Sequence, residues 1–230
     1  MEKKKIITID GPSGAGKSTV SKMLATKLGY IYLDTGALYR ALAYKALKIK
    51  ISPEDAYALS GMCSTTNVIL KNINGEMKVY VDGEDVGDKI RSEEVGLAAS
   101  KISTFAVVRE RLINLQREAG KNGGIVAEGR DMGSVVFSCA DYKFYLDANI
   151  EERTNRRYKE LSAKGVIIGH QVIQKDMVDR DNQDSKRAIA PLRVPADALI
   201  IDSTGLSAEQ VVGKIIELIS IKNGEDRPNH

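Results

Sequence analysis

The sequence predicts an α/β fold in which a central sheet of five parallel strands is flanked by helices and accompanied by a small antiparallel β insertion. Short apolar runs rich in β-branched residues alternate along the chain with segments of helical periodicity, a pattern typical of parallel sheets. A glycine-rich stretch joins the first apolar run to the first helical segment. The length of 230 residues suits one core domain with appendages.

The expected elements follow from periodicity and turn chemistry. Strands are expected at residues 6–9, 30–33, 125–127, 143–146 and 199–201. Helices are expected at residues 17–28, 35–48, 93–101, 105–119 and 207–221. Ser52 and Pro53 are expected to cap and begin a further helix, and Ser207 with Gln210 to form a capping box.

The sequence pattern of residues 67–86 differs from the β/α alternation of the rest of the chain. Strand-like pieces there are separated by turns at Asn74-Gly75 and Asp82-Gly83, which favour hairpins. This stretch therefore predicts a small antiparallel meander. Because it interrupts the β/α alternation, we interpret it as an insertion of roughly 30 residues, outside the core.

Composition excludes several classes of protein. The 34 basic and 31 acidic residues are too evenly balanced to indicate bulk nucleic-acid binding. No apolar run approaches the ~20 residues that span a bilayer, and the apolar run after the basic N-terminus is too short for a signal peptide. Cys63 and Cys139 lack metal-site spacing, and both are expected in the core. We expect a cytoplasmic monomer that binds neither nucleic acid nor membranes.

Residues 11–18 fit the pattern G-x-x-x-x-G-K-[ST] between a predicted strand and a predicted helix. Backbone N–H groups of such a loop surround phosphate oxygens, while the Lys17 ammonium reaches the β/γ-phosphates and the Ser18 hydroxyl ligates Mg²⁺. The sequence therefore predicts a P-loop NTPase core. The candidate ATP-binding residues are Gly11, Pro12, Ser13, Gly14, Ala15, Gly16, Lys17, Ser18 and Thr19.

A P-loop alone does not specify the reaction. The chain lacks the guanine-reading Asn-Lys-x-Asp segment of regulatory GTPases. Several arginines, however, fall near the ends of predicted elements, where they could converge on an anionic acceptor. They are Arg40, Arg109, Arg130, Arg180 and Arg187. Taken singly, each is more often a solvated helix residue than a ligand.

Four motifs occur in the order and spacing typical of bacterial cytidylate kinases, at residues 11–17, 33–40, 128–133 and 180–187. The chain resembles this family over about residues 4–220. The resemblance implies Mg²⁺-dependent, in-line transfer of the ATP γ-phosphate to CMP or dCMP. It also implies a core (1–34, 100–150, 166–225), an NMP-binding region (35–99) with the insertion at about 64–90, and a helical lid (151–165).

The resemblance further implies roles for individual residues. Arg40 and Arg130 would bind the CMP phosphate, and Arg180 and Asp184 the ribose. The residues implied for the cytosine pocket are Thr35, Ser100, Arg109, Asp131 and Arg187. The lid would contribute Arg153, Arg156 and Arg157, and the residues implied to act in catalysis are Lys17, Arg130, Asp131, Arg153 and Arg157.

Base chemistry supports part of this assignment. Cytosine has an exocyclic amino donor that a carboxylate such as Asp131 accepts, and acceptors that a guanidinium such as Arg109 satisfies. Uracil presents a carbonyl oxygen instead of the amino group and would leave buried polar groups unpaired. Thr35 and Glu128 stand where many relatives have Ser and Asp, which predicts shifted geometry with the same functional groups.

Two other functions remain open at this stage. A related P-loop kinase could act on adenylate, uridylate or shikimate, although the insertion and the motif at 128–133 argue against this. A P-loop protein could instead hydrolyse nucleotide to control a partner, and ATPase activity without an acceptor would distinguish the two. Neither His170 nor His230 is a candidate site residue, since phosphoryl transfer needs no catalytic base.

Overall fold

A mostly parallel sheet organises residues 4–225, which are the part of the chain that the computed structural model describes. The strands are β1 (Ile6–Asp10), β2 (Ile31–Asp34), β3 (Val68–Ile73), β4 (Glu76–Val81), β5 (Glu84–Asp85), β6 (Ile125–Gly129), β7 (Tyr142–Asp147) and β8 (Leu199–Asp202). The helices are α1 (Lys17–Leu28), α2 (Thr35–Lys48), α3 (Ala56–Thr65), α4 (Glu93–Ile102), α5 (Ala106–Gly120), α6 (Ile150–Ala163), α7 (His170–Lys186) and α8 (Ala208–Glu225). A short π-helix, η1 (Met132–Val136), follows β6.

The strand order is β3-β4-β2-β6-β1-β7-β8, and β5 pairs with β4. The five predicted strands β2, β6, β1, β7 and β8 are neighbours and parallel, which confirms the expected core sheet. Ile7 is in register with Val126 on one side and with Tyr142 on the other. The carboxyl ends of these strands therefore meet at one edge, where the motifs at 11–17, 33–40 and 128–133 lie, while the motif at 180–187 ends α7.

The meander extends this sheet, which corrects our interpretation that it lies outside the core. β3 and β4 pair antiparallel over six residue pairs, and β4 joins β2 through the single parallel pair Tyr32–Glu76. Val68, Val79 and Val81 are buried against the helices of the same half of the molecule. Turn residues identify the hairpins from sequence, but the long-range pair that attaches them leaves no local signal.

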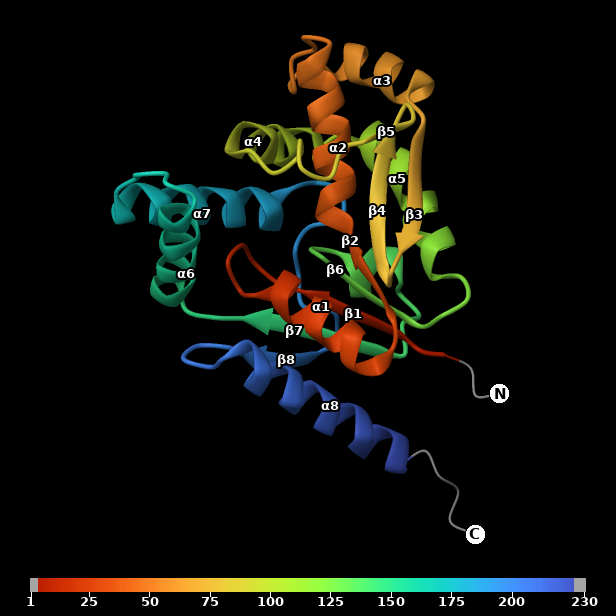
Figure 1. Cartoon of the computed structure of the whole chain (residues 1–230), viewed down its shortest axis with the longest axis vertical. Helices are drawn as coiled ribbons and strands as arrows, with labels where there is room; N and C mark the ends of the chain where they lie inside the picture. The colour runs from red at the N-terminus through yellow and green to blue at the C-terminus, as the bar shows by residue number, and fades with distance from the viewer. Residues whose placement is uncertain (1–3, 226–230) are drawn as a thin grey trace.

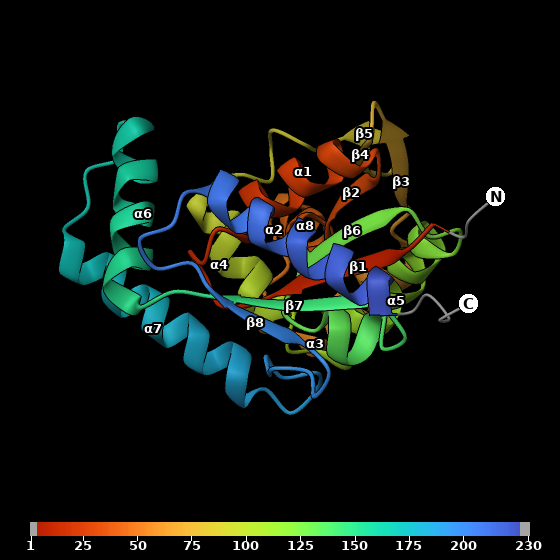
Figure 2. The same ribbon diagram turned by 90° about the horizontal axis from the view of Figure 1, so that it is seen from below.

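Helices cover both faces of the sheet (Figure 1). On one face, α1 and α8 pack through Val20, Leu24 and Val212 against β1 and β7, and Figure 2 shows α8 lying across those strands. On the other face, η1 and α5 enclose Leu33 and Ala127. The helices α6 and α7 project to one side, and α2, α3 and α4 rise above the sheet with the meander (Figure 1).

Most helix starts agree with the sequence prediction. Ser207 accepts a hydrogen bond from the Gln210 N–H at 3.2 Å and donates its own N–H to the Gln210 side chain at 2.8 Å, which confirms the capping box. The expected helix start at Ser52 is wrong, because Asp55 caps α3 by accepting from the Ala58 N–H at 2.9 Å.

The structure also tests what the sequence predicts for the cysteines and for membrane-spanning segments. Cys63 is buried as expected, whereas Cys139 is exposed in the loop between η1 and β7, which corrects its assignment to the core. Within residues 4–225, none of the helices combines the length and the apolar character needed to cross a membrane.

Candidate active site

The P-loop connects the end of β1 to the start of α1. Gly11 has φ +150° and lies so close to β7 that an added Cβ would come 2.0 Å from the Leu146 carbonyl oxygen. Gly16, directly before α1, is left-handed with φ +92°. The loop conformation therefore requires glycine at both positions, and it presents the N-terminus of α1 to the edge of the sheet.

Lys17 is buried within this loop. Its ammonium donates to the Pro12 carbonyl at 2.6 Å, and only 6% of the residue is exposed. Burial and, next, the positive charge of Arg130 lower the pKa of Lys17 to about 7. A buried cation beside further cations is a favourable place for an anionic ligand.

The end of β6 places a carboxylate next to the P-loop. Glu128 is 4% exposed and accepts a hydrogen bond from the Tyr32 hydroxyl on β2. Burial, followed by the negative charge of Asp34, raises the pKa of Glu128. The Thr35 hydroxyl donates to the Glu128 carbonyl at 2.6 Å and so lies at the same edge.

The loop after β6 carries Arg130 and Asp131, and Asp10 holds it in place. The Asp10 carboxylate accepts from the N–H groups of Met132 and Gly133 at 2.8 and 2.7 Å. This contact fixes the start of η1 over the end of β1. Arg130 and Asp131 consequently face α5 and α7, where their partners lie.

One network of buried ion pairs forms between these elements, because Arg187 Nη1 also lies 3.8 Å from Asp184 Oδ1. Asp131 pairs with Arg109 of α5, and Arg187, directly after α7, donates to its other oxygen at 3.2 Å. Arg130 Nε lies 2.8 Å from Asp184 Oδ2. The Arg109 guanidinium also lies 5.5 Å from the centre of the Tyr39 ring. The structure thus brings together residues that the sequence separates by up to 148 positions, from Tyr39 to Arg187.

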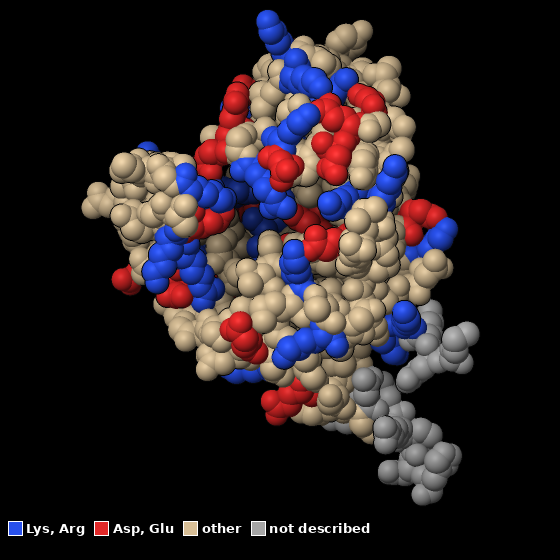
Figure 3. Space-filling view, viewed as in Figure 1, with Lys and Arg blue, Asp and Glu red and all other residues tan. Residues whose placement is uncertain are grey.

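Two buried polar atoms in this cluster lack partners. Within the described residues, neither Arg180 Nε nor Ser100 Oγ has a hydrogen-bond partner. Burial and then the charge of Arg130 lower the pKa of Arg180 to about 10. Buried polar atoms usually have partners, so a polar ligand bound at this cluster would satisfy both atoms. Figure 3 shows basic side chains gathered where the surface is hollowed between the part with α2 and α4 and the part with α6.

Arg40 lies in the second turn of α2, the helix that follows β2. Its guanidinium pairs with Asp34 at 2.7 Å, and Asp34 also caps α2 by accepting from the Ala37 N–H at 3.0 Å. Arg40 is therefore anchored to the helix start that follows β2, and it does not pair with the carboxylates of the Arg130 cluster.

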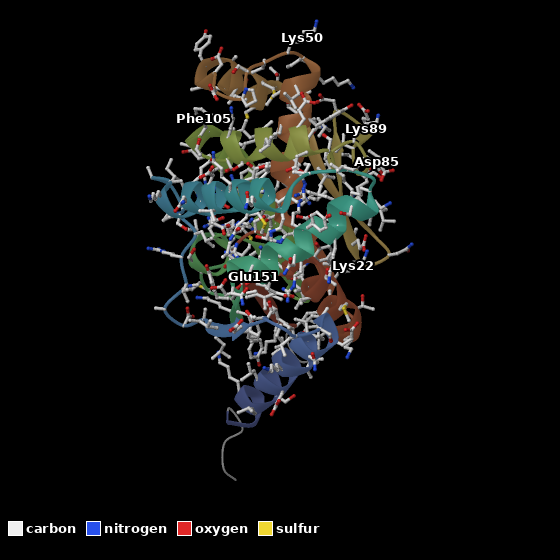
Figure 4. The ribbon with its side chains drawn as sticks, turned by 90° about the vertical axis from the view of Figure 1, so that its left-hand side faces the viewer. Lys22, Lys50, Asp85, Lys89, Phe105 and Glu151 are labelled. Carbon is white, nitrogen blue, oxygen red and sulfur yellow. The ribbon has the colours of Figure 1, made fainter. Side chains whose placement is uncertain are left out.

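The three arginines of α6 each contact a different part of the protein. In Figure 4, α6 and α7 face the viewer. Arg153 donates to the Ser13 carbonyl of the P-loop at 3.0 Å. Arg156 reaches the Ala15 carbonyl at 3.3 Å and the Ser203 carbonyl at 2.7 Å. Arg157 pairs instead with Glu93 of α4 and with Glu160, away from the P-loop.

A cavity of about 150 Å³ lies beside the P-loop, and sequence reasoning missed most of its lining. Its walls include Gly16 and Thr19 from the loop and α1, Arg156 from α6, and Ser203 and Leu206 from the segment after β8. Ser203 and Leu206 could have been found from their position in the sequence. They directly follow the last parallel strand, and such residues lie at the ligand-binding edge of the sheet.

Comparison with known proteins identifies relatives over nearly the whole chain. A protein-family model described as Cytidylate kinase matches residues 7–221. A protein of Caldicellulosiruptor bescii named cytidylate kinase is 47% identical over 216 residues, covering 94% of this chain and 96% of its own. One of Geobacter sulfurreducens with the same name is 46% identical over 214 residues, covering 93% and 92%.

Among solved structures, an uncharacterised protein of Eubacterium ventriosum superposes with a TM-score of 0.54. The two chains are 14% identical, and the match covers 95% of this chain and 99% of the other. At that identity the likeness concerns the fold alone.

Proposed function

This chain belongs to the cytidylate kinase family, and from that premise we propose how its residues perform ATP-dependent phosphorylation of CMP and dCMP. It is a phosphotransferase that uses the P-loop for its donor. The observation that carries the assignment of the acceptor site is the buried Arg180 Nε, which has no partner in residues 4–225 and lies among the arginines of the acceptor motifs. An anion or a nucleotide hydroxyl would satisfy it.

We propose that ATP lies with its phosphates on residues 11–19 and its base in the cavity beside Arg156 and Ser203. Lys17 would leave the Pro12 carbonyl to contact the β/γ-phosphates. Arg153, already in contact with the loop, and Arg157 would neutralise charge that develops on the transferring group.

We propose that the acceptor lies above the carboxyl ends of β2 and β6. Arg40 and Arg130 would clamp its phosphate, and Arg180 and Asp184 its ribose. The proposed cytosine pocket consists of Thr35, Ser100, Arg109, Asp131 and Arg187. Asp131 keeps lone pairs for the base despite its two arginine partners, since a carboxylate can accept about four hydrogen bonds.

We propose that Ser18 and Glu128 hold the Mg²⁺ that accompanies ATP. Both offer the oxygen atoms that Mg²⁺ prefers, and a cation would offset the burial that raises the pKa of Glu128. Within residues 4–225 no cluster of three acidic, histidine or cysteine side chains is arranged to hold a metal, as suits an ion bound largely through nucleotide phosphates. When bound, Mg²⁺ would neutralise charge on the β- and γ-oxygens.

Phosphoryl transfer requires alignment and charge neutralisation, and no catalytic base is needed. The P-loop would fix the donor phosphates and the Arg130 cluster the acceptor phosphate, so that the acceptor oxygen attacks in line. Closure of α6 and its loop over ATP would exclude water that otherwise hydrolyses it.

An acceptor screen tests this function. The purified protein, ATP and Mg²⁺ are incubated with CMP, dCMP, UMP or AMP, and ADP formation is measured. We expect rapid turnover with CMP and dCMP and slow turnover without acceptor. Equal ADP formation with and without CMP would instead indicate a nucleotide hydrolase.

We further propose that the protein is a monomer in the cytoplasm. Light scattering tests the oligomeric state, and cell fractionation tests the location.

A further inference from the structure

One carboxylate of α7 contacts the donor side of the site. Asp181 follows Arg180 in the sequence and accepts the Ser13 N–H of the P-loop at 3.1 Å through Oδ1. Its other oxygen, Oδ2, pairs with Arg153 of α6. The same Arg153 nitrogen donates to the Ser13 carbonyl at 3.0 Å. Asp181, Ser13 and Arg153 therefore form a closed set of contacts between α7, the P-loop and α6.

This set lies where the P-loop rests directly on the two helices. A Cβ added to Gly14 would come 2.6 Å from Met177 Cε and 3.1 Å from Arg153 Cβ. The backbone of the loop and the two helices are thus in van der Waals contact, and Asp181 is only partly exposed. No larger residue fits at Gly14 between the loop and the two helices.

A carboxylate next to a phosphate-binding loop is unfavourable on charge alone, since ATP brings several negative charges to the same place. Its pairing with Arg153 removes that penalty and fixes the guanidinium. Arg153 uses Nε for the Ala148 carbonyl at 2.9 Å and Nη1 for Asp181 and Ser13. Within the described residues, no partner occupies Nη2, which remains to donate to a phosphate.

The helix that carries Asp181 also carries acceptor residues. Arg180 precedes it, and Asp184, three residues later, pairs with Arg130. We infer that Asp181 is a positioning residue, which holds Arg153 and the front of the P-loop at a fixed distance from the acceptor-binding residues of α7. This inference rests on the proposed function, and it assigns Asp181 no contact with either nucleotide.

The variant Asp181→Asn tests this role, because asparagine keeps an oxygen for the Ser13 N–H but loses the charge that orients Arg153. The matched control is Asp179→Asn, an exposed residue of the same helix. We expect kcat/KM for ATP to fall about tenfold or more in Asp181→Asn, since small misplacements near the reacting atoms have effects of this size. The control should stay within about twofold of wild type.

Binding of each nucleotide alone separates positioning from general damage to the structure. The dissociation constants of a non-hydrolysable ATP analogue and of CMP are measured by calorimetry. We expect weaker binding of the analogue and unchanged binding of CMP. Equal losses for both nucleotides would overturn the inference, because α7 would then simply be distorted. The calorimetric dissociation constants do not depend on turnover. They therefore test the inference even if the acceptor screen shows no phosphorylation of CMP.

A double-mutant cycle of Asp181→Asn and Arg153→Gln provides the second test. If Asp181 acts through Arg153, then adding Asp181→Asn to Arg153→Gln should change kcat/KM for ATP by less than about threefold. Fully additive effects would show that Asp181 works independently of Arg153 and would overturn the inference. Wild-type phosphorylation of CMP in the same assay reports separately on the proposed function.

Discussion

Arg157 of α6 forms an ion pair with Glu93, the first residue of α4. The pair joins the segment that we propose as the lid to the region that we propose for the acceptor. Since we also propose that Arg157 contacts the phosphates of ATP, binding of ATP must compete with Glu93 for this guanidinium. Both side chains are partly exposed, so the pair contributes about 1 kcal/mol or less.

The variant Glu93→Gln should therefore lower KM for ATP, by up to about fivefold, because Arg157 no longer has to leave a carboxylate. Glu94→Gln, at the next exposed position of α4, should leave KM unchanged. Steady-state kinetics at saturating CMP measures both. An increase of KM in Glu93→Gln would mean that the pair persists in the complex with ATP.

Lys17→Ala should nearly abolish transfer while leaving the affinity for CMP largely intact, because its charge acts on the donor phosphates. Titration of CMP against variant and wild type, with turnover measured in the same samples, checks both parts. Turnover close to that of wild type would remove Lys17 from its proposed role.

Lys17 also predicts a dependence on pH. Burial and Arg130 lower its pKa to about 7 without nucleotide, below the ordinary value of 10.5. The unfolded chain then binds more protons than the folded protein between these values, so Lys17 lowers stability at neutral pH and this loss diminishes as pH rises from about 7 toward 10. ATP phosphates favour the charged ammonium, so binding at pH 8 should take up a proton. Calorimetry in buffers of different ionisation enthalpy measures this uptake, and Lys17→Met should abolish it.

Arg130→Lys should cost about 2 kcal/mol or more in transition-state stabilisation, although the charge is kept. Arg130 uses Nε for Asp184 and Nη1, at 3.4 Å, for the Gly129 carbonyl, so Nη2 is the terminal nitrogen left to donate to a phosphate. One ammonium cannot provide these contacts in the same geometry. Arg193→Lys, at an exposed arginine, is the control. Wild-type kcat/KM in Arg130→Lys would show that Arg130 does not clamp the acceptor.

Asp131→Asn should narrow the preference for CMP over UMP by about 1–3 kcal/mol, because an amide can face either base edge. The structure adds a second effect. Arg109 loses its buried counter-charge and Arg187 keeps only Asp184, at 3.8 Å, so the protein should also lose about 3 kcal/mol of stability. Urea denaturation and kinetics with both acceptors measure the two effects. If the folded variant keeps the wild-type ratio of kcat/KM for CMP to that for UMP, Asp131 does not distinguish the bases. Arg109 or Ser100 would then do so.

The sequence predicts those parts of this molecule that depend on neighbouring residues. Helices α1 and α2 begin and end as predicted, because glycine, Asp34 and apolar periodicity act within a few positions. The contact of Asp181 with Ser13 spans 168 positions, and that of Arg156 with Ser203 spans 47. Such contacts depend on how the strands assemble, and no local pattern encodes them. Cys139 shows the same limit, since its exposure depends on where η1 ends against the sheet.

The attachment of β4 to β2 has a mechanical consequence. One residue pair and the hydrogen bond from the Tyr32 N–H to the Gly75 carbonyl, at 2.8 Å, close this seam, whereas six residue pairs join β3 to β4. The sheet can part here with the loss of very few backbone hydrogen bonds. Side chains hold the meander instead, because Lys22 of α1 pairs with Glu76 of β4, and Leu70 and Met77 pack against the cluster that contains Leu33 and Ile125. The position of α2 and Arg40 relative to the five central strands thus depends on packing more than on backbone pairing.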